Sequence, residues 1–224
     1  MKPVFTALAL AACWSALPVS ANDADLAQAI LEIQNQWAHI NYEVPAGEKV
    51  AAYQALEKRE AALEKQYPDR PEPKIWYGIT LSSHAGAKGG LGALGLAKDA
   101  RRQLQAAEQI DPAAMQGSAY TSLGTLYYKV PGWPLGFGDD DKAEAYLKKA
   151  LQANPNGIDP NYFYADYLYG KHRYSEAMQA LEKALAAPPR PQRPLADKGR
   201  RQEIHALIEK VRAEAGDALK SAAR

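Results

Sequence analysis

The sequence predicts an all-α fold, a solenoid of stacked helical hairpins, from three observations. First, a pattern of small and large apolar residues recurs after 34 residues: Ala143, Leu147, Ala150 and Pro155 return as Ala177, Leu181, Ala184 and Pro189. Second, apolar residues elsewhere are spaced three and four apart, which places them on one face of a helix. Third, Asp-Pro and Asn-Pro pairs divide the chain, because a residue that precedes proline avoids the helical backbone region. A single hairpin cannot bury its apolar stripe, so the hairpins are expected to stack.

Residues 1–21 are predicted to be an export signal. Lys2 provides the positive start, residues 4–17 are apolar, and small residues lead to a cleavage site after Ala21. The expected location is therefore the periplasm. The alternative is a lipoprotein signal, in which the Leu10-Ala11-Ala12-Cys13 segment would be lipidated at Cys13. No segment reaches the ~20 apolar residues of a membrane span.

The composition indicates an ordinary globular protein. Hydrophobic residues make up 47% and charged residues 24% of the 224 residues. The formal charge of +1 gives no reason to expect nucleic acid or an anionic membrane as a partner. The single cysteine excludes an intramolecular disulfide.

Residues 22–70 are predicted to form an amino-terminal helical hairpin. Two apolar stripes with helical spacing carry this prediction: Leu26, Ile30, Ile33, Trp37 and Ile40, followed by Tyr53, Leu56, Leu63 and Tyr67.

Residues 71–189 are predicted to form three hairpins. In the second, Tyr120, Leu123, Gly124 and Tyr127 have the W-x2-L-G-x2-Y spacing, and the 34-residue pattern above supplies the second helix. In the first, Trp76 and Ile79 are followed by Ala100, Leu104, Ala107 and Pro112. Over residues 72–189 the chain resembles the tetratricopeptide repeat (TPR) family. Small residues are expected where two helices approach closely, and leucines between them.

Two glycine-rich insertions, residues 83–92 and 129–138, lengthen the first and second hairpin turns. Such insertions fall on one face of a solenoid, often the binding face. Trp133 and Phe137 either fold back over the neighbouring hairpin or close one side of a pocket. Together with Leu94-Gly95-Leu96-Ala97-Lys98 and the stretch from Pro131-Gly132 to Gly138-Asp139 that leads into Lys142-Ala143, these loops resemble those of exported TPR proteins that include the T-component of TRAP transporters, which associates with a periplasmic solute-binding protein. The resemblance implies a transport-associated scaffold.

The concave groove is the predicted binding surface. Transferring the family's groove positions gives Lys74, Tyr77, Leu81 and His84, then Ser118, Thr121, Thr125 and Tyr128, then Asp159, Tyr162, Asp166 and Tyr169. The expected function is therefore a scaffold that binds a protein or peptide partner. The alternative is a carrier of a small lipophilic or amphipathic ligand. The predicted binding residues are Tyr77, His84, Thr125, Tyr128, Trp133, Tyr162, Asp166 and Tyr169, although the tyrosines could equally pack between helices.

Residues 190–224 are predicted to form a proline-rich linker and a capping helix with the apolar stripe Ile204, Leu207, Ile208 and Val211.

No catalytic, metal or cofactor site is predicted. The four histidines lie on separate elements without ligand spacing. Asp139-Asp140-Asp141 is expected to cap the following helix. Neither a serine nucleophile elbow nor a dinucleotide fingerprint occurs, so no enzyme activity is expected, and the oligomeric state stays open.

Overall fold

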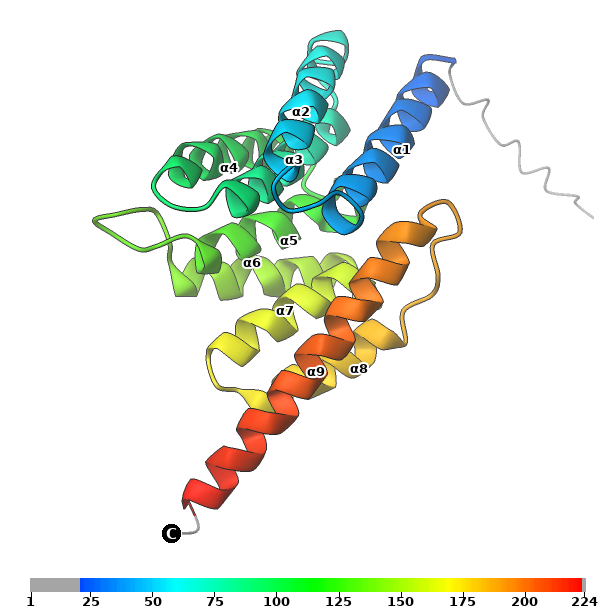
Figure 1. Cartoon of the computed structure of the whole chain (residues 1–224). Coiled ribbons are helices and arrows are strands. Elements are labelled where there is room, and N and C mark those ends of the chain that lie inside the picture. The colour runs from blue at the N-terminus through cyan, green and yellow to red at the C-terminus, as the bar shows by residue number, and fades with distance from the viewer. Residues whose placement is uncertain (1–20, 223–224) are drawn as a thin grey trace, which may run out of the picture.

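The computed structural model describes residues 21–222, which form nine α-helices (Figure 1). They are α1 (Ala21–Tyr42), α2 (Lys49–Gln66), α3 (Pro71–Lys88), α4 (Gly92–Ile110), α5 (Ala114–Lys129), α6 (Asp140–Ala153), α7 (Ile158–Gly170), α8 (Tyr174–Leu185) and α9 (Pro194–Ala222). The predicted all-α class is confirmed. The segment ahead of Ala21, where most of the export signal and Cys13 fall, lies outside the described residues. Within the described part, no helix is both long and apolar enough to cross a membrane.

Three hairpins, α3–α4, α5–α6 and α7–α8, stack in chain order (Figure 1). In the first two, the helices meet where a glycine faces a fully buried leucine. A Cβ on Gly124 would lie 2.7 Å from Leu147 Cγ, and one on Gly78 would lie 2.6 Å from Leu104 Cγ. A side chain at either glycine position would collide with the leucine. Because glycine has no side chain, the backbones of the two helices can pack close together.

The amino-terminal helices α1 and α2 extend the stack. α2 packs along α3, and α1 lies beside both of them. Trp37 of α1 donates a hydrogen bond from Nε1 to Ser83 Oγ of α3 at 2.9 Å. A buried polar tip with a partner is the usual arrangement for an interior tryptophan.

Helix α9 both caps the stack and reaches back to its beginning. Its apolar stripe, Ile204, Leu207, Ile208 and Val211, is buried. The helix packs against α8 and α7, and its first turns contact α1 (Figure 1). A solenoid cap only has to cover the last hairpin. Here the contact with α1 also joins the first helix to the last across the concave side.

The two glycine-rich segments behave differently. In the first, helices α3 and α4 extend into the expected insertion, and only residues 89–91 lie between them. Gly89 and Gly90 make that turn with φ near +60°, which glycine adopts at no steric cost. The second segment is an extended loop before α6. Asp139 caps α6 as predicted, with Oδ1 accepting from the Lys142 backbone N–H at 3.0 Å.

Candidate functional site

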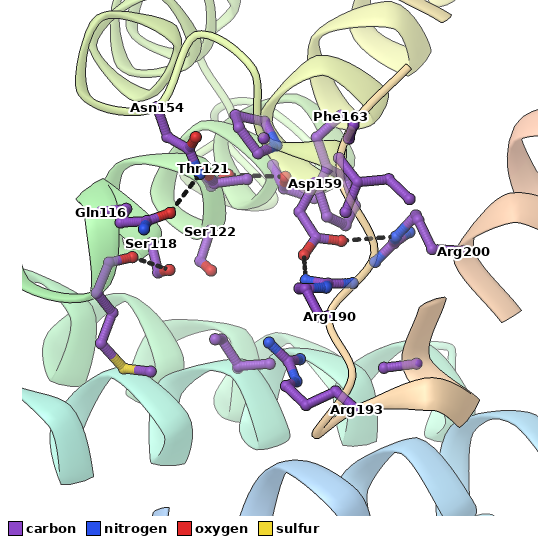
Figure 2. Close-up of a pocket in the computed structure, with 18 of the residues that line it drawn as sticks. Gln116, Ser118, Thr121, Ser122, Asn154, Asp159, Phe163, Arg190, Arg193 and Arg200 are labelled. Atoms are coloured by element: carbon purple, nitrogen blue, oxygen red, sulfur yellow. Dashed lines mark hydrogen bonds and ion pairs between the residues drawn. The ribbon is translucent and has the colours of Figure 1, made fainter. Parts of the chain in front are cut away.

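The concave side contains a pocket of about 700 Å³, enclosed by α1, α3, α5 and α7 and by the segment that leads into α9 (Figure 2). This volume is in the range of small-molecule sites. The side chains that carry its chemistry are Trp37, Trp76, Ile79, Met115, Ser118, Thr121, Ser122, Thr125, Leu126, Asn154, Asp159, Phe163, Arg190, Arg193 and Arg200. They combine aromatic rings, hydroxyl groups, one carboxylate and three guanidinium groups.

One part of the wall is aromatic. Trp37 and Trp76 meet edge to face with ring centroids 6.0 Å apart. Phe163 of α7 lines the same cavity, beside the linker. Such rings offer a large apolar surface with few rotatable bonds, so a ligand can pack against them at a small entropic cost.

The opposite part of the wall is hydroxylic and comes from α5. Ser118, Thr121, Ser122 and Thr125 follow one another at spacings of three, one and three residues, so they lie along one side of this helix. Figure 2 shows Ser118, Thr121 and Ser122 side by side. These groups can donate or accept hydrogen bonds.

A left-handed turn precedes this face of α5. Met115, Gln116 and Gly117 have φ values of 48°, 57° and 74°. Gln116 Oε1 accepts from Asn154 Nδ2 at 2.9 Å, which ties this turn to the start of the α6–α7 connection. Non-glycine residues in this region carry strain, and strain of this kind often accompanies binding sites.

Asp159, at the start of α7, joins two arginines of the pocket. Its Oδ2 accepts from Arg190 Nη1 at 2.6 Å, and its Oδ1 accepts from Arg200 Nε at 2.8 Å (Figure 2). Burial alone would raise the pKa of Asp159, but Arg200 and Arg190 outweigh it and hold this pKa well below the usual range. The carboxylate is therefore ionised and fixes both the linker and α9 against α7.

Each of these two arginines has a second carboxylate. Arg190 Nε donates to Asp197 Oδ1 at 2.5 Å, and Arg200 Nη1 donates to Glu203 Oε2 at 2.6 Å.

The third arginine, Arg193, has none. Among the described residues no carboxylate lies within 4.0 Å of its guanidinium, and its buried Nε has no hydrogen-bond partner. The guanidinium carbon lies 5.2 Å from the centroid of the Trp76 ring. Burial and the nearby charge of Arg190 lower the pKa of Arg193 from its ordinary value. A guanidinium nevertheless stays charged in proteins, so Arg193 is a charged side chain of the pocket that has no direct ion pair.

Residues 135–210 match the tetratricopeptide repeat family model. This match spans 76 of the 224 residues and includes α6, α7, α8 and the first part of α9. No curated protein matches the sequence. Among solved structures, the chain is similar to a thermophilic TPR protein from Thermus thermophilus, with a TM-score of 0.43 and 19% identity. That similarity covers 81% of this chain and 98% of the other.

The first TPR-like unit has a different register from the predicted one. The prediction aligned Trp76 with the aromatic residue of the motif, and in that alignment the glycine position of the motif falls at Thr80. In the structure Gly78 packs against Leu104 in the same way as Gly124 packs against Leu147. The motif of the first unit is therefore aligned two residues earlier in the sequence.

Tyr77 and His84 consequently face α2, and neither lines the pocket. His84 is buried with Nδ1 2.7 Å from Glu57 Oε1. Tyr77 lies near the α2 carboxylates, and its pKa is raised by burial and by these charges. Gly78 was the available signal for the correct register.

Most of the other predicted groove residues are engaged within the protein. Tyr128 donates to Asp166 at 2.6 Å, and Tyr162 lies 4.5 Å beneath the Arg200 guanidinium. Tyr169 donates to Glu214 of α9 at 2.5 Å. Of the eight predicted binding residues only Thr125 lines the pocket, whereas Ser118, Thr121 and Asp159 of the wider set of predicted groove positions line it as well. Partner binding by this set stays a prediction.

The two loop aromatics differ from each other. Phe137 folds back against Tyr127, with ring centroids 5.7 Å apart, and Arg101 covers it. Trp133 is 89% exposed and does not line the pocket.

Sequence reasoning missed the arginines of the pocket. Trp37 and Trp76 are buried in the core, as their spacing predicts, and their additional place in the pocket wall was not predicted. Arg190, Arg193 and Arg200 recur at intervals of three and seven residues around the linker, which was the available signal. Within the described residues, no three His, Cys, Asp or Glu side chains are grouped to hold a metal ion.

Proposed function

We propose that this chain is an exported TPR-type scaffold that binds an amphipathic ligand, without converting it, in the closed part of its concave groove. The observation that carries this proposal is the pocket of about 700 Å³ beneath the linker and α9. Repeat solenoids generally serve as scaffolds for interactions, and they bind through this concave surface.

The shape of the groove favours a compact ligand over a long peptide. Arg200 of α9 covers Tyr162, and Glu214 of α9 binds Tyr169, so the groove of α7 is occupied by the chain itself. An extended peptide that ran from repeat to repeat would have to displace α9. The aromatic wall and the facing hydroxyl groups suit a ligand with an apolar body and a polar end.

Binding of anilinonaphthalene sulfonate to the purified protein tests the proposal. This dye has an apolar body and one negative charge, and its fluorescence rises when it leaves water. We expect saturable binding to the wild type. Ser122→Phe, which adds a ring inside the pocket, should weaken binding about tenfold by occupying the space. Gln152→Phe on the exposed side of α6 is the matched control and should bind as the wild type does.

Absence of saturable binding to a folded wild type would refute the proposal. Equal loss of binding in both variants would also count against it, since only Ser122 lines the pocket. Circular dichroism of each variant should accompany the titrations, because the dye also binds loosely packed states.

A second candidate function, docking of a protein partner, is favoured by the α5–α6 loop. Trp133 is 89% and Leu135 is 67% exposed. The loop packs beside the start of α4, where a Cβ on Gly136 would lie 3.3 Å from Leu94 Cδ1, and Leu91 on the adjoining turn is 87% exposed. Exposed apolar side chains gathered on one face indicate a protein interface.

The resemblance to T-components makes a periplasmic solute-binding protein the expected partner for this loop. A pull-down from the periplasmic fraction with the wild type, Trp133→Ser and Ser122→Phe tests this second function. Loss of a reproducible partner in Trp133→Ser alone would support docking at the loop. Retention of every partner by Trp133→Ser would refute it.

A further inference from the structure

We propose that Arg193 is the anchor for the carboxylate of an amphipathic ligand, whose apolar part packs against Trp37, Trp76 and Phe163. This inference rests on the proposed function and specifies the chemistry of its ligand.

The charge pattern of the pocket points to Arg193. Arg190 and Arg200 share Asp159, and each has a further carboxylate of its own, Asp197 or Glu203. Arg193 lies between these two arginines in the sequence, and no described carboxylate pairs with it. Burying a charged group without a partner is costly, so an unpaired guanidinium at a cavity wall is a place where an anion would be stabilised.

A second unpartnered donor lies in the same wall. Trp76 Nε1 is buried and has no hydrogen-bond acceptor among the described residues. Its ring is the one over which the Arg193 guanidinium lies. Nearly all buried donors in folded proteins have an acceptor. Both residues of this stacked pair line the ligand-sized cavity, so the wall carries more donor groups than the described residues satisfy.

The position of Arg193 is fixed before any ligand binds. Its backbone N–H donates to Arg190 O at 2.8 Å, and the next residue, Pro194, begins α9. The Arg193 guanidinium carbon lies 5.2 Å from the centroid of the Trp76 ring, within cation–π distance. Figure 2 shows Arg193 reaching into the cavity from the side opposite Thr121 and Ser122. Because the guanidinium is held in place, little side-chain entropy is lost on binding.

A carboxylate fits this site better than a phosphate dianion. Asp159 is ionised and acts electrostatically on Arg193, so a dianion would be repelled more strongly than a monoanion. One guanidinium can bind one carboxylate through two parallel N–H···O bonds. The aromatic wall then takes the uncharged remainder of the ligand.

Titration calorimetry with decanoate, decanol and decyl phosphate tests the inference. We expect the wild type to bind decanoate at least about tenfold more tightly than decanol. Arg193→Met keeps the apolar stem over Trp76 but removes the charge, so this preference should disappear while decanol binding persists. Arg193→Lys should keep part of the preference, because it keeps the charge but loses the two-bond geometry. Arg212→Met, on the exposed side of α9, is the matched control and should behave as the wild type does.

The same preference in Arg193→Met as in the wild type would overturn the inference, and so would tighter binding of decyl phosphate than of decanoate. If Arg193→Met does not fold, the inference is still tested by the preference of the wild type for decanoate over decanol and by the size of that preference in Arg193→Lys. Equal binding of decanoate and decanol refutes the carboxylate anchor but leaves the pocket function standing. Failure of all three ligands and of the dye to bind refutes both.

A carboxylate could come from a free amphiphile or from the end of a peptide. An apolar tripeptide with a free carboxyl end, compared with its amide, separates the two sources. The anchor is supported if decanoate binds at least about tenfold more tightly than decanol, or if the tripeptide acid binds at least about tenfold more tightly than its amide. Whichever of the two acids binds more tightly identifies the source of the carboxylate.

Discussion

Gly199 of α9 lies against the ring of Tyr42 at the end of α1. A Cβ on Gly199 would lie 2.4 Å from Tyr42 Cε1, so only glycine allows this approach. Tyr42 also donates to Glu203, one turn further along α9, at 3.4 Å. The contact joins the first and last described helices and so helps to close the pocket.

Gly199→Ala is expected to loosen this closure. The new methyl group collides with a ring, which should lower the free energy of unfolding by about 1–2 kcal/mol despite the better helix propensity of alanine. Binding of anilinonaphthalene sulfonate should weaken in parallel. Gly216→Ala in the same helix has nothing within 4 Å of the new Cβ, and it should leave binding unchanged. Equal behaviour of the two variants in urea unfolding and dye titration would contradict the role of Gly199.

Gly78→Ala tests the register of the first TPR-like unit. Because the added methyl group would lie 2.6 Å from Leu104 Cγ and 3.2 Å from the Ala100 carbonyl oxygen, we expect a loss of about 1–3 kcal/mol. Gly86→Ala on the same helix, with open space around its Cβ, should instead be neutral or stabilise by up to about 1 kcal/mol. Thermal melts compare the two. If Gly86→Ala proved to be the destabilising change, the Gly78–Leu104 pairing would be wrong.

Glu60 gives the stability a pH dependence. Its side chain is fully buried, accepts from Thr80 Oγ1 at 2.7 Å, and has a second oxygen without a partner. Burial, with a smaller contribution from Glu57, raises the pKa of Glu60 well above its usual value, although the Thr80 hydrogen bond opposes this. The folded state therefore keeps a proton that the unfolded state releases, so this group makes stability fall as pH rises above the ordinary glutamate pKa.

Glu60→Gln should remove that dependence. A neutral amide carries no charge to bury, so the variant should be more stable than the wild type by about 1 kcal/mol or more at about pH 8, and this advantage should shrink towards about pH 5. Urea unfolding at both pH values measures the effect. Glu182→Gln, at an exposed position of α8, is the control and should parallel the wild type. A constant difference between Glu60→Gln and the wild type at both pH values would contradict a raised pKa.

Tyr128 is expected to act on stability through Asp166. Tyr128→Phe removes the 2.6 Å hydrogen bond and leaves Lys129 as the remaining partner of the carboxylate, which should cost about 1 kcal/mol. Tyr128→Ala also removes the ring contact with Tyr167 and should cost about 3 kcal/mol or more. Chemical denaturation of both variants checks this. If both variants were as stable as the wild type but no longer bound a partner, Tyr128 would instead be a binding residue.

The helices and their pairing into hairpins could be predicted because they follow from local sequence. Leu104, Leu147 and Leu181 are fully buried, as their spacing requires, and Asp139 caps α6. The pocket could not be predicted in the same way. Tyr162 and Tyr169 occupy groove positions of α7 by their spacing, but α9 covers them. Periodicity tells which face of a helix is apolar, and it does not tell which distant segment covers that face.

The sequence alone therefore determined the all-α class, the repeated hairpins and the small residues where helices meet in the last two hairpins, because these depend on propensities and spacings within some thirty residues. Tertiary structure decided the path of α9 back to α1, the two-residue register of the first unit and the isolation of Arg193. Arg193 has no direct ion pair because Asp159, Asp197 and Glu203 pair with Arg190 and Arg200. Pairings between residues more than thirty positions apart, such as Asp159 with Arg200, depend on how the whole solenoid curves, which no local pattern encodes.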